Sequence, residues 1–392
     1  MSQRYGEQEI AAQLEKIFGA GDGPIAVGRA PGRVNLIGEH TDYNDGFVFP
    51  MAIDFEMRMA GRKRADRMVR IYSQEYQRVV EFSLDNITFD GGEQWSNYPR
   101  GVLSELQEAG LELPGMDLAF SGNIPQGAGL SSSAALEVVT AVIARELAGF
   151  TFDDPKLARL CQRAENEFVG MKCGIMDPFI SLMGRKGHAL FLDCRSLEFR
   201  HIPLTLGDYR VVICKSGVKH SLVDSEYNVR RRQCEEGVAV LSKRFWEVWA
   251  LRDVTLEQLE RCRPELDPVI YRRCRHIVEE NERVVESVAA LTAGDLARFG
   301  GLMNASHDSL RDLYEVSCPE IDRLVELARS VPRVLGSRMT GGGFGGCTVN
   351  LVAESAIPEF ERMVLEPYRK ETGIEPEFYI STPAAGAKIL FK

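Results

Sequence analysis

The order of apolar and polar positions along the 392 residues predicts a mixture of strands and helices. In the first half, short runs rich in strand-forming residues predict strands at 47–59, 68–72, 78–82 and 117–121. Pro50 lies inside the first run and has no N–H to donate, so we expect an edge or bulged strand there. Longer runs of Ala, Leu, Val and Glu predict helices at 131–147 and 155–168.

The second half of the chain is richer in helical pattern. Apolar runs predict strands at 188–194, 210–214, 347–353, 377–380 and 387–391. Residues 225–330 are largely helical by pattern, with a turn at 291–295, and 355–371 predicts a further helix. A glycine-rich loop is expected at 338–346. This mixture predicts an α/β (α+β) fold. Because the length exceeds what one compact core usually holds, we expect two domains, 1–200 and 201–392.

Composition narrows the class of protein. Hydrophobic residues make up 44% and charged residues 27%, which excludes disordered, collagen-like and low-complexity chains. The longest apolar stretch, 136–150, is interrupted by three charged residues, so no membrane-spanning helix and no membrane partner are expected. The first ten residues are polar and charged, unlike a secretory signal, and we therefore expect a cytoplasmic protein.

The charges and cysteines exclude further classes. A net charge of −10 argues against a nucleic-acid partner, which would require a basic face. The dense basic cluster at 230–232 is followed by Glu235 and Glu236 at helical spacing, which predicts a solvated helix surface. The nine cysteines are scattered without a C-x-x-C pair, so neither a disulfide framework nor a zinc site is indicated, and most are expected to be small buried residues.

The first segment with candidate chemistry is 31–43, PGRVNLIGEHTDY. Glu39, His40 and Asp42 lie within four residues, directly after Gly38. They can present several acceptors and one switchable group to a polyhydroxylated ligand, and a site that pairs buried hydroxyls rejects analogues strongly. On composition alone, a polar turn with an ordinary salt bridge is the more frequent outcome.

The second segment is 127–137, GAGLSSSAALE, which precedes and begins a predicted helix. Small residues let the backbone approach a ligand closely, and a helix N-terminus directs free N–H groups and a positive dipole end at it. We therefore expect a phosphate site. Capping of the helix by Ser131 or Ser132 is the competing interpretation, but it explains one serine and not three.

The third segment, 341–346, matches G-x-G-x-x-G but is followed by a predicted strand. A dinucleotide fingerprint should open a helix, so the Rossmann interpretation is rejected, and contact with a phosphate or with neighbouring backbone stays open. The P-loop motif G-x-x-x-x-G-K-[ST] and the protein-kinase motifs are absent.

A further acidic stretch joins these segments. Glu165 lies on a predicted helix and is a candidate magnesium ligand, and Asp177 lies past the end of that helix on a glycine-bearing loop as a candidate base. Taken alone, each is more often a surface acid.

Together the segments resemble the galactokinases, within the superfamily of galactokinase, homoserine, mevalonate and phosphomevalonate kinases. Residues 32–44 are similar to the galactokinase signature, 127–134 to the second motif and 339–346 to the third. The similarity also covers 173–177, 225–227 and 317–320, and so runs over most of the chain.

This resemblance implies a two-domain sugar kinase whose active site lies in the inter-domain cleft. It would use ATP and Mg²⁺ to phosphorylate the anomeric hydroxyl of α-D-galactose, giving α-D-galactose 1-phosphate and ADP. Asp177 corresponds to the catalytic aspartate, Arg33 to the arginine beside it, and Ser133 and Glu165 to the magnesium ligands. The expected sugar contacts are Glu39, His40, Thr41, Asp42, Gly174 and Tyr227. The expected nucleotide contacts are Trp95, Asn97, Gly127, Ala128, Gly129, Leu130, Ser131, Ser132 and Ser133.

Phosphoryl transfer depends mostly on positioning and charge stabilisation, which suits these groups. Asp177 can accept the proton of the anomeric hydroxyl, or act as an electrostatic positioner, and both roles stay open. Two residues depart from the pattern of relatives. Pro178 should bias Asp177 toward extended backbone, and Pro99 stands where relatives usually carry an apolar residue.

Two other functions stay open from the sequence. One is a kinase of the same fold acting on another sugar, such as N-acetylgalactosamine or arabinose. The other is a non-catalytic galactose sensor with a transcriptional partner, which the complete serine loop and the presence of Arg33 and Asp177 disfavour. A monomer and a weak dimer are both compatible with the sequence.

Overall fold

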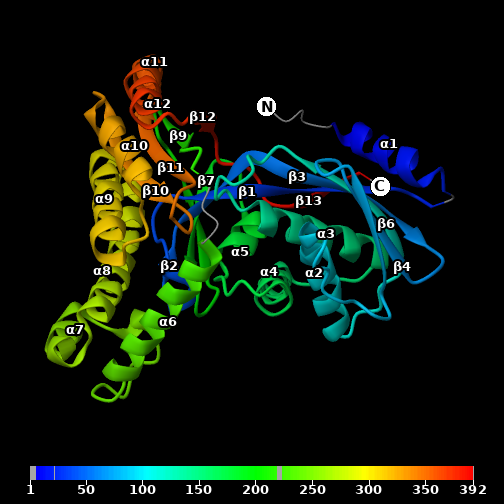
Figure 1. The fold of residues 1–392 in the computed structure, drawn as a ribbon, viewed down its shortest axis with the longest axis horizontal. Coiled ribbons are helices and arrows are strands. Elements are labelled where there is room, and N and C mark those ends of the chain that lie inside the picture. Colours follow the sequence, from blue (N-terminus) through cyan, green and yellow to red (C-terminus); the bar gives the residue numbers. More distant parts are fainter. Residues whose placement is uncertain (1–5, 22, 219–222, 392) are drawn as a thin grey trace.

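A computed structural model describes residues 6–21, 23–218 and 223–391 of the chain. The larger region is built on a six-stranded sheet with the order β13-β1-β3-β6-β4-β5 (Figure 1). Neighbouring strands are antiparallel except β4 and β6, which are parallel. The strands are β1 (Ala26–Asn35), β3 (Pro50–Arg64), β4 (Met68–Ser73), β5 (Arg78–Ser83), β6 (Gly115–Gly122) and β13 (Lys388–Phe391).

Helices cover both faces of this sheet (Figure 1). Helix α1 (Glu7–Phe18) packs Ile10 and Leu14 on one face, whereas α3 (Ser132–Ala148) and α5 (Met176–Met183) pack on the other. Helices α2 (Asn97–Glu108) and α4 (Asp154–Arg163) lie outside α3. Because successive side chains of a strand point to opposite faces, the central strands are buried along both.

The second region is built on a four-stranded antiparallel sheet with the order β10-β11-β9-β12. Its strands are β9 (Tyr209–Lys215), β10 (Val334–Thr340), β11 (Cys347–Ala353) and β12 (Glu377–Ser381). Alternate residues of β9 face α9 or the layer formed by α10, α11 and α12. The helices of this half are α6 (Val223–Leu241), α7 (Leu256–Cys262), α8 (Pro268–Thr292), α9 (Leu296–Ser309), α10 (Pro319–Ser330), α11 (Ile357–Phe360) and α12 (Glu366–Thr372).

A small three-stranded sheet completes the fold. It is formed by β2 (Phe47–Val48), β7 (His188–Asp193) and β8 (Phe199–Pro203). Within the described residues, no helix combines the length and the apolar character needed to cross a bilayer.

Six of the nine cysteines are buried, as predicted. The domain boundary near residue 200 stays a prediction, and the last strand, β13, returns to pair with β1.

Most predicted elements are confirmed, and the exceptions have physical reasons. The edge position expected from Pro50 is wrong, because β3 lies between β1 and β6, and Pro50 is tolerated as its first residue. The expected bulge is present, since the register with β1 shifts between Pro31 and Arg33. The predicted glycine loop 338–346 is shorter, because residues 338–340 belong to β10.

Six of the described helices and strands escaped prediction: α1, β1, α2, α5, β8 and β10. In β1, Gly28, Pro31 and Gly32 interrupt the apolar pattern. The basic cluster was interpreted correctly only in part. Arg231 pairs with Glu235 at 3.1 Å on the surface, but Arg230 is buried and donates to the Tyr314 and Glu315 carbonyls at 2.9 Å and 2.8 Å.

Candidate active site

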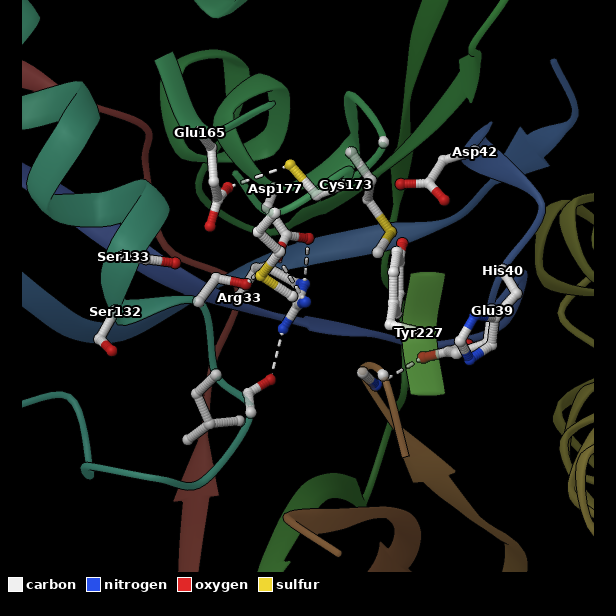
Figure 2. A pocket seen from close by; sticks show the side chains of 18 of the residues that line it. Arg33, Glu39, His40, Asp42, Ser132, Ser133, Glu165, Cys173, Asp177 and Tyr227 are labelled. Carbon is white, nitrogen blue, oxygen red and sulfur yellow. Dashed lines mark hydrogen bonds and ion pairs between the residues drawn. The ribbon is translucent and has the colours of Figure 1, made fainter. Parts of the chain in front are cut away.

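A cavity of about 220 Å³ forms where the N-terminal sheet, the loop before α3, the start of α5 and the loop after β10 meet (Figure 2). It brings together most of the predicted site residues from segments far apart in the sequence. Those that line it are Arg33, Glu39, His40, Asp42, Gly127, Gly129, Leu130, Ser131, Ser132, Ser133, Glu165, Gly174, Asp177 and Tyr227.

Asp177 is held rigidly at the centre of this cavity. The Arg33 guanidinium, at the end of β1, donates to both Asp177 carboxylate oxygens at 2.7 Å and to the Gly129 carbonyl at 2.7 Å. The Ser131 hydroxyl donates to Asp177 Oδ2. Since a carboxylate offers about four acceptor positions, these three hydrogen bonds leave one for a ligand.

The backbone at Asp177 differs from the prediction. Asp177 lies in the first turn of α5, not on a loop, and its backbone is helical rather than extended. Pro178 follows it in the same turn, where the N–H that proline lacks would have no partner within the helix. Pro99 is accommodated in the same way in the first turn of α2.

Ser131 does not cap α3, contrary to the competing interpretation of the serine loop. Its backbone is left-handed, with φ of +61°, and its side chain makes no capping hydrogen bond. The N-terminus of α3 therefore has no capping side chain from Ser131, and Ser132 and Ser133, its first residues, line the cavity. This leaves N–H groups and the positive end of the helix dipole available for an anion.

Asp42 and Gly174 form a tightly packed pair at the other side of the cavity. Burial raises the pKa of Asp42 to about 6, and the charge of Asp177 acts in the same direction. A Cβ atom on Gly174 would lie 1.9 Å from Asp42 Oδ2, so a side chain at this position would collide with the carboxylate. Only glycine lets the loop approach Asp42 so closely.

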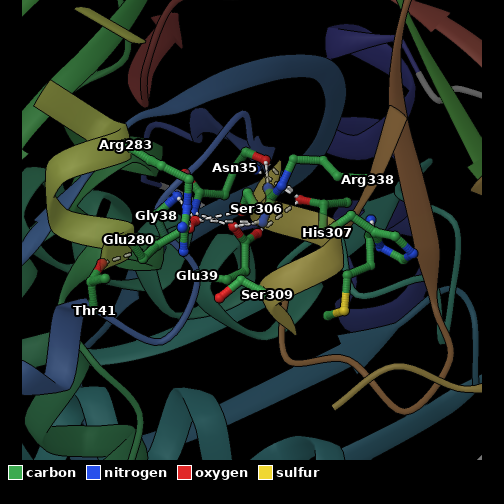
Figure 3. Close-up of polar contacts among 12 residues, drawn as sticks. Asn35, Gly38, Glu39, Thr41, Glu280, Arg283, Ser306, His307, Ser309 and Arg338 are labelled. Atoms are coloured by element: carbon green, nitrogen blue, oxygen red, sulfur yellow. Dashed lines mark hydrogen bonds and ion pairs between the residues drawn. The ribbon is translucent and has the colours of Figure 1, made fainter. Parts of the chain in front are cut away.

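The Glu39 carboxylate joins the first and third sequence motifs (Figure 3). It forms an ion pair of 2.5 Å with Arg338, which is fully buried, and accepts from Asn35 Nδ2 and from the Gly341 N–H at 2.9 Å each. Burial raises the pKa of Glu39, against the opposing effect of Arg338. The glycine-rich loop 341–346 packs closely against neighbouring backbone: a Cβ atom on Gly341 would lie 3.0 Å from the Gly129 carbonyl oxygen.

Glu280 of α8 supports the same segment from behind. Its Oε1 accepts from the Gly38 N–H at 2.9 Å and from the Ser306 hydroxyl at 2.6 Å, and its Oε2 accepts from Arg283 at 2.6 Å. Burial opposes its charge, but Arg283 and other cationic neighbours outweigh that effect and lower the pKa of Glu280 to about 2. Sequence reasoning missed Glu280 and the role of Arg338, because no local pattern shows that they are buried: Glu280 lies in the polar helical run 279–283, and Arg338 adjoins the glycine-rich loop.

Aromatic rings pack around His40. Its Nδ1 lies 2.9 Å from the Tyr43 hydroxyl, and the Tyr227 ring centroid lies 5.3 Å from its own. Burial lowers the pKa of His40 to about 3, so the imidazole is neutral across the physiological range. The expectation of a switchable group at His40 is therefore wrong.

A second cavity of about 270 Å³ adjoins the first and shares Gly127, Ser132 and Ser133 with it. It is lined by aromatic rings, including Trp95 and Tyr76, which stack with their centroids 5.8 Å apart. Such a surface suits a planar heterocycle.

The structure does not bring every predicted residue to a cavity. The Asn97 amide bonds the backbone N–H and carbonyl of Asp90 at 2.8 Å each. The Thr41 hydroxyl lies within donating distance of both the Gly38 and the Phe47 carbonyl, at 2.9 Å and 2.6 Å, and Ala128 is buried. These side chains support the site from outside the lining of either cavity.

Ser133 and Glu165 both line the first cavity and lie on the same side of it in Figure 2. The Cys173 thiol donates to Glu165 Oε2 at 3.1 Å. Within the described residues, no group of three or more His, Cys, Asp or Glu side chains forms a ready-made metal site. A hydroxyl and a carboxylate oxygen nevertheless fit Mg²⁺, which takes one or two protein ligands and completes its shell with phosphates and water.

Comparison with known proteins gives consistent matches. Residues 12–63 match the galactokinase galactose-binding signature, 97–185 the N-terminal domain of GHMP kinases and 287–370 their C-terminal domain. The galactokinase of Lactococcus lactis, solved in complex with galactose, is 37% identical, with a TM-score of 0.94, over 97% of this chain and 98% of its own.

More distant structures share the fold. The mevalonate kinase of Methanococcus jannaschii is 20% identical, with a TM-score of 0.64, over 93% of this chain and 99% of its own. The homoserine kinase of Cytophaga hutchinsonii is 17% identical, with a TM-score of 0.59, over 95% and 99%. These likenesses confirm the predicted two-domain α/β fold.

Proposed function

The chain belongs to the galactokinases of the GHMP kinase superfamily, and from this premise we propose how its two cavities carry out the reaction. The enzyme uses ATP to phosphorylate galactose at its anomeric hydroxyl, giving α-D-galactose 1-phosphate and ADP. We assign galactose to the cavity around Asp177 and the adenine of ATP to the aromatic cavity beside Trp95.

The observation that carries this assignment is that Asp177 and Arg33 line the first cavity and are bonded to Ser131 and Gly129 of the loop before α3, which reaches both cavities. The residues that the cavities share, Gly127, Ser132 and Ser133, belong to the loop and first turn of α3, which would bind the ATP phosphates. A sugar hydroxyl beside Asp177 would then face the terminal phosphate, and holding two reactants in this way lowers the barrier.

Asp177 accepts the proton of the anomeric hydroxyl in this proposal. As the sugar oxygen forms its bond to the γ-phosphorus, the bond from that phosphorus to the β–γ bridging oxygen breaks, and ADP leaves. Arg33 fixes both oxygens of Asp177 through two hydrogen bonds. The acceptor position that Arg33 and Ser131 leave free is available for the sugar.

Mg²⁺ would be held by Ser133 and Glu165 and would neutralise negative charge on the phosphates. The sugar contacts are assigned to Glu39, His40, Asp42, Gly174 and Tyr227, which line the cavity. Because the cavity is lined from both halves of the chain, we place the active site in the cleft between domains 1–200 and 201–392. The cytoplasmic location, the lack of nucleic-acid and membrane partners, and the monomeric or weakly dimeric state stay predictions.

A coupled ADP-release assay on a panel of sugars tests this account. Galactose should be phosphorylated and glucose ignored, because a pocket that pairs the C4 hydroxyl of galactose leaves buried groups unsatisfied with glucose. Faster turnover of N-acetylgalactosamine or arabinose would shift the assignment to another sugar kinase. Galactose binding without ADP release would favour the sensor.

A further inference from the structure

Glu137 is a buried acid without a hydrogen-bonding partner. It lies on α3, is fully buried, and neither carboxylate oxygen bonds to any atom of the described residues. Leaving a buried polar group unpaired destabilises a protein, and does so more strongly when the group is charged. An apolar side chain, as at the neighbouring Val138 and Val139, would avoid this loss, so the carboxyl requires an explanation.

The position of Glu137 on α3 supplies an explanation for its buried, unpaired carboxyl. It follows Ser133 by four residues on the same helix, and residues at this spacing lie on one helix face. Ser133 lines both cavities, so Glu137 lies one turn deeper beneath it.

The electrostatic surroundings of Glu137 point to the same place. Besides burial, the charges of Glu165 and Asp177 raise the pKa of Glu137 well above its ordinary value. Two other carboxylates therefore act electrostatically on Glu137, and the neighbouring side chains of Cys161 and Cys173 bring no positive charge. Asp177 is paired with Arg33. A cation held at Ser133 would supply a partner for Glu137, whose carboxyl has none among the described residues.

We propose that Glu137 is a positioning residue of the magnesium site, which accepts hydrogen bonds from the water shell of a cation held by Ser133 and Glu165. This inference rests on the proposed function. An acceptor one helical turn below a metal ligand suits this role, because Mg²⁺ keeps several of its waters in proteins. Residues that hold a metal's ligands or waters typically contribute 10–100-fold to metal affinity.

The test compares nucleotide binding with and without the metal. The non-hydrolysable ATP analogue with a β,γ-imido bridge is titrated into the full chain by calorimetry, once with Mg²⁺ and once with EDTA. The ratio of the two affinities is the metal contribution. In Glu137→Gln, which keeps the shape of the side chain, this ratio should fall about tenfold or more, whereas the affinity in EDTA should be unchanged.

Thr140→Val is the matched control. Thr140 is also buried on α3, three residues beyond Glu137, and its hydroxyl donates to the Leu136 carbonyl. This variant loses a buried polar group without removing a carboxylate, so the metal contribution should equal that of the wild type. A second variant, Glu137→Met, should lose the metal contribution as well and should melt at or above the wild-type temperature.

Several results would overturn the proposal. They are a wild-type metal contribution in Glu137→Gln, an equal loss of affinity with and without Mg²⁺, and a loss of cooperative melting in both Glu137 variants. If Mg²⁺ leaves the affinity of the wild type unchanged, the metal role of Ser133 and Glu165 fails together with that of Glu137. If Mg²⁺ raises the affinity of the wild type and of the Glu137 variants equally, this inference fails and the metal role of Ser133 and Glu165 stands.

Discussion

Replacing Gly174 by alanine should disrupt the sugar site through one steric contact. The added Cβ would lie 1.9 Å from Asp42 Oδ2 and 2.1 Å from Asp42 Cγ. Ordinary contacts of a Cβ atom begin at 3.4 Å, so the carboxylate and the loop must separate by the difference, 1.5 Å. Either Asp42 leaves its position or the loop moves and displaces Asp177, three residues further along the chain.

The size of the effect follows from this displacement. A misplacement of about 1 Å in an active site can reduce the rate about 10²-fold. We therefore expect kcat/KM for galactose to fall about 100-fold in Gly174→Ala, measured by coupled ADP release. The protein should still melt cooperatively, because the contact lies at the edge of a cavity and not in the core.

Gly170→Ala is the matched control on the same loop. Gly170 has no atom within 4 Å of its ideal Cβ, but its φ is +95°. Alanine there should destabilise the protein by about 1–2 kcal/mol through backbone strain and leave galactose kinetics unchanged. Wild-type kcat/KM in Gly174→Ala, or an equal loss of activity in both variants, would refute the steric reasoning.

Four other substitutions test separate parts of the account. Ser133→Ala and Glu165→Ala should each raise the Mg²⁺ concentration for half-maximal rate and leave galactose binding without nucleotide unchanged; a Mg²⁺ dependence that moves in neither variant would remove both residues from the metal site. Because the pKa of Asp42 is raised from 3.8 to about 6, the folded state holds a proton there that the unfolded state releases, and stability falls as pH rises through this window. Asp42→Asn should therefore melt at a higher temperature than the wild type at pH 7.5 but not below pH 4, and it should lose most galactose activity. If the variant and the wild type melted at the same temperature at both pH values, the raised pKa of Asp42 would be contradicted. Glu280→Ala leaves the buried Arg338 and Arg283 without a carboxylate partner at this position and should lower the free energy of unfolding in urea by about 3–5 kcal/mol; a loss below about 1 kcal/mol would show that the network contributes little.

From the sequence we could name residues of the candidate site, but not the long-range contacts that hold those residues in place. Arg33, Asp177 and the serine loop, which the family resemblance singled out through local motifs, line one cavity in the structure. The direct contact between Ser131 and Asp177, and the close approach of Gly174 to Asp42, depend on segments more than 40 residues apart. No local pattern encodes such contacts.

The errors have a common cause. Burial decides the state of His40 and the pairing of Arg230, yet both residues lie in stretches that are polar in sequence. Strand β1 escaped detection because Gly28, Pro31 and Gly32 interrupt its apolar alternation. Glu137 stood inside an apolar helix and showed its significance only through its missing partners.

The assignment of Asp177 as the group that accepts the sugar proton is the central claim, and Asp177→Asn tests it most directly. The substitution keeps the shape of the side chain and removes the proton acceptor. Calorimetry should give the wild-type affinity for galactose, whereas the coupled assay should detect no ADP. General-base catalysis typically contributes about 10²–10⁴-fold, so a variant that retains more than about a tenth of the wild-type rate would contradict the account.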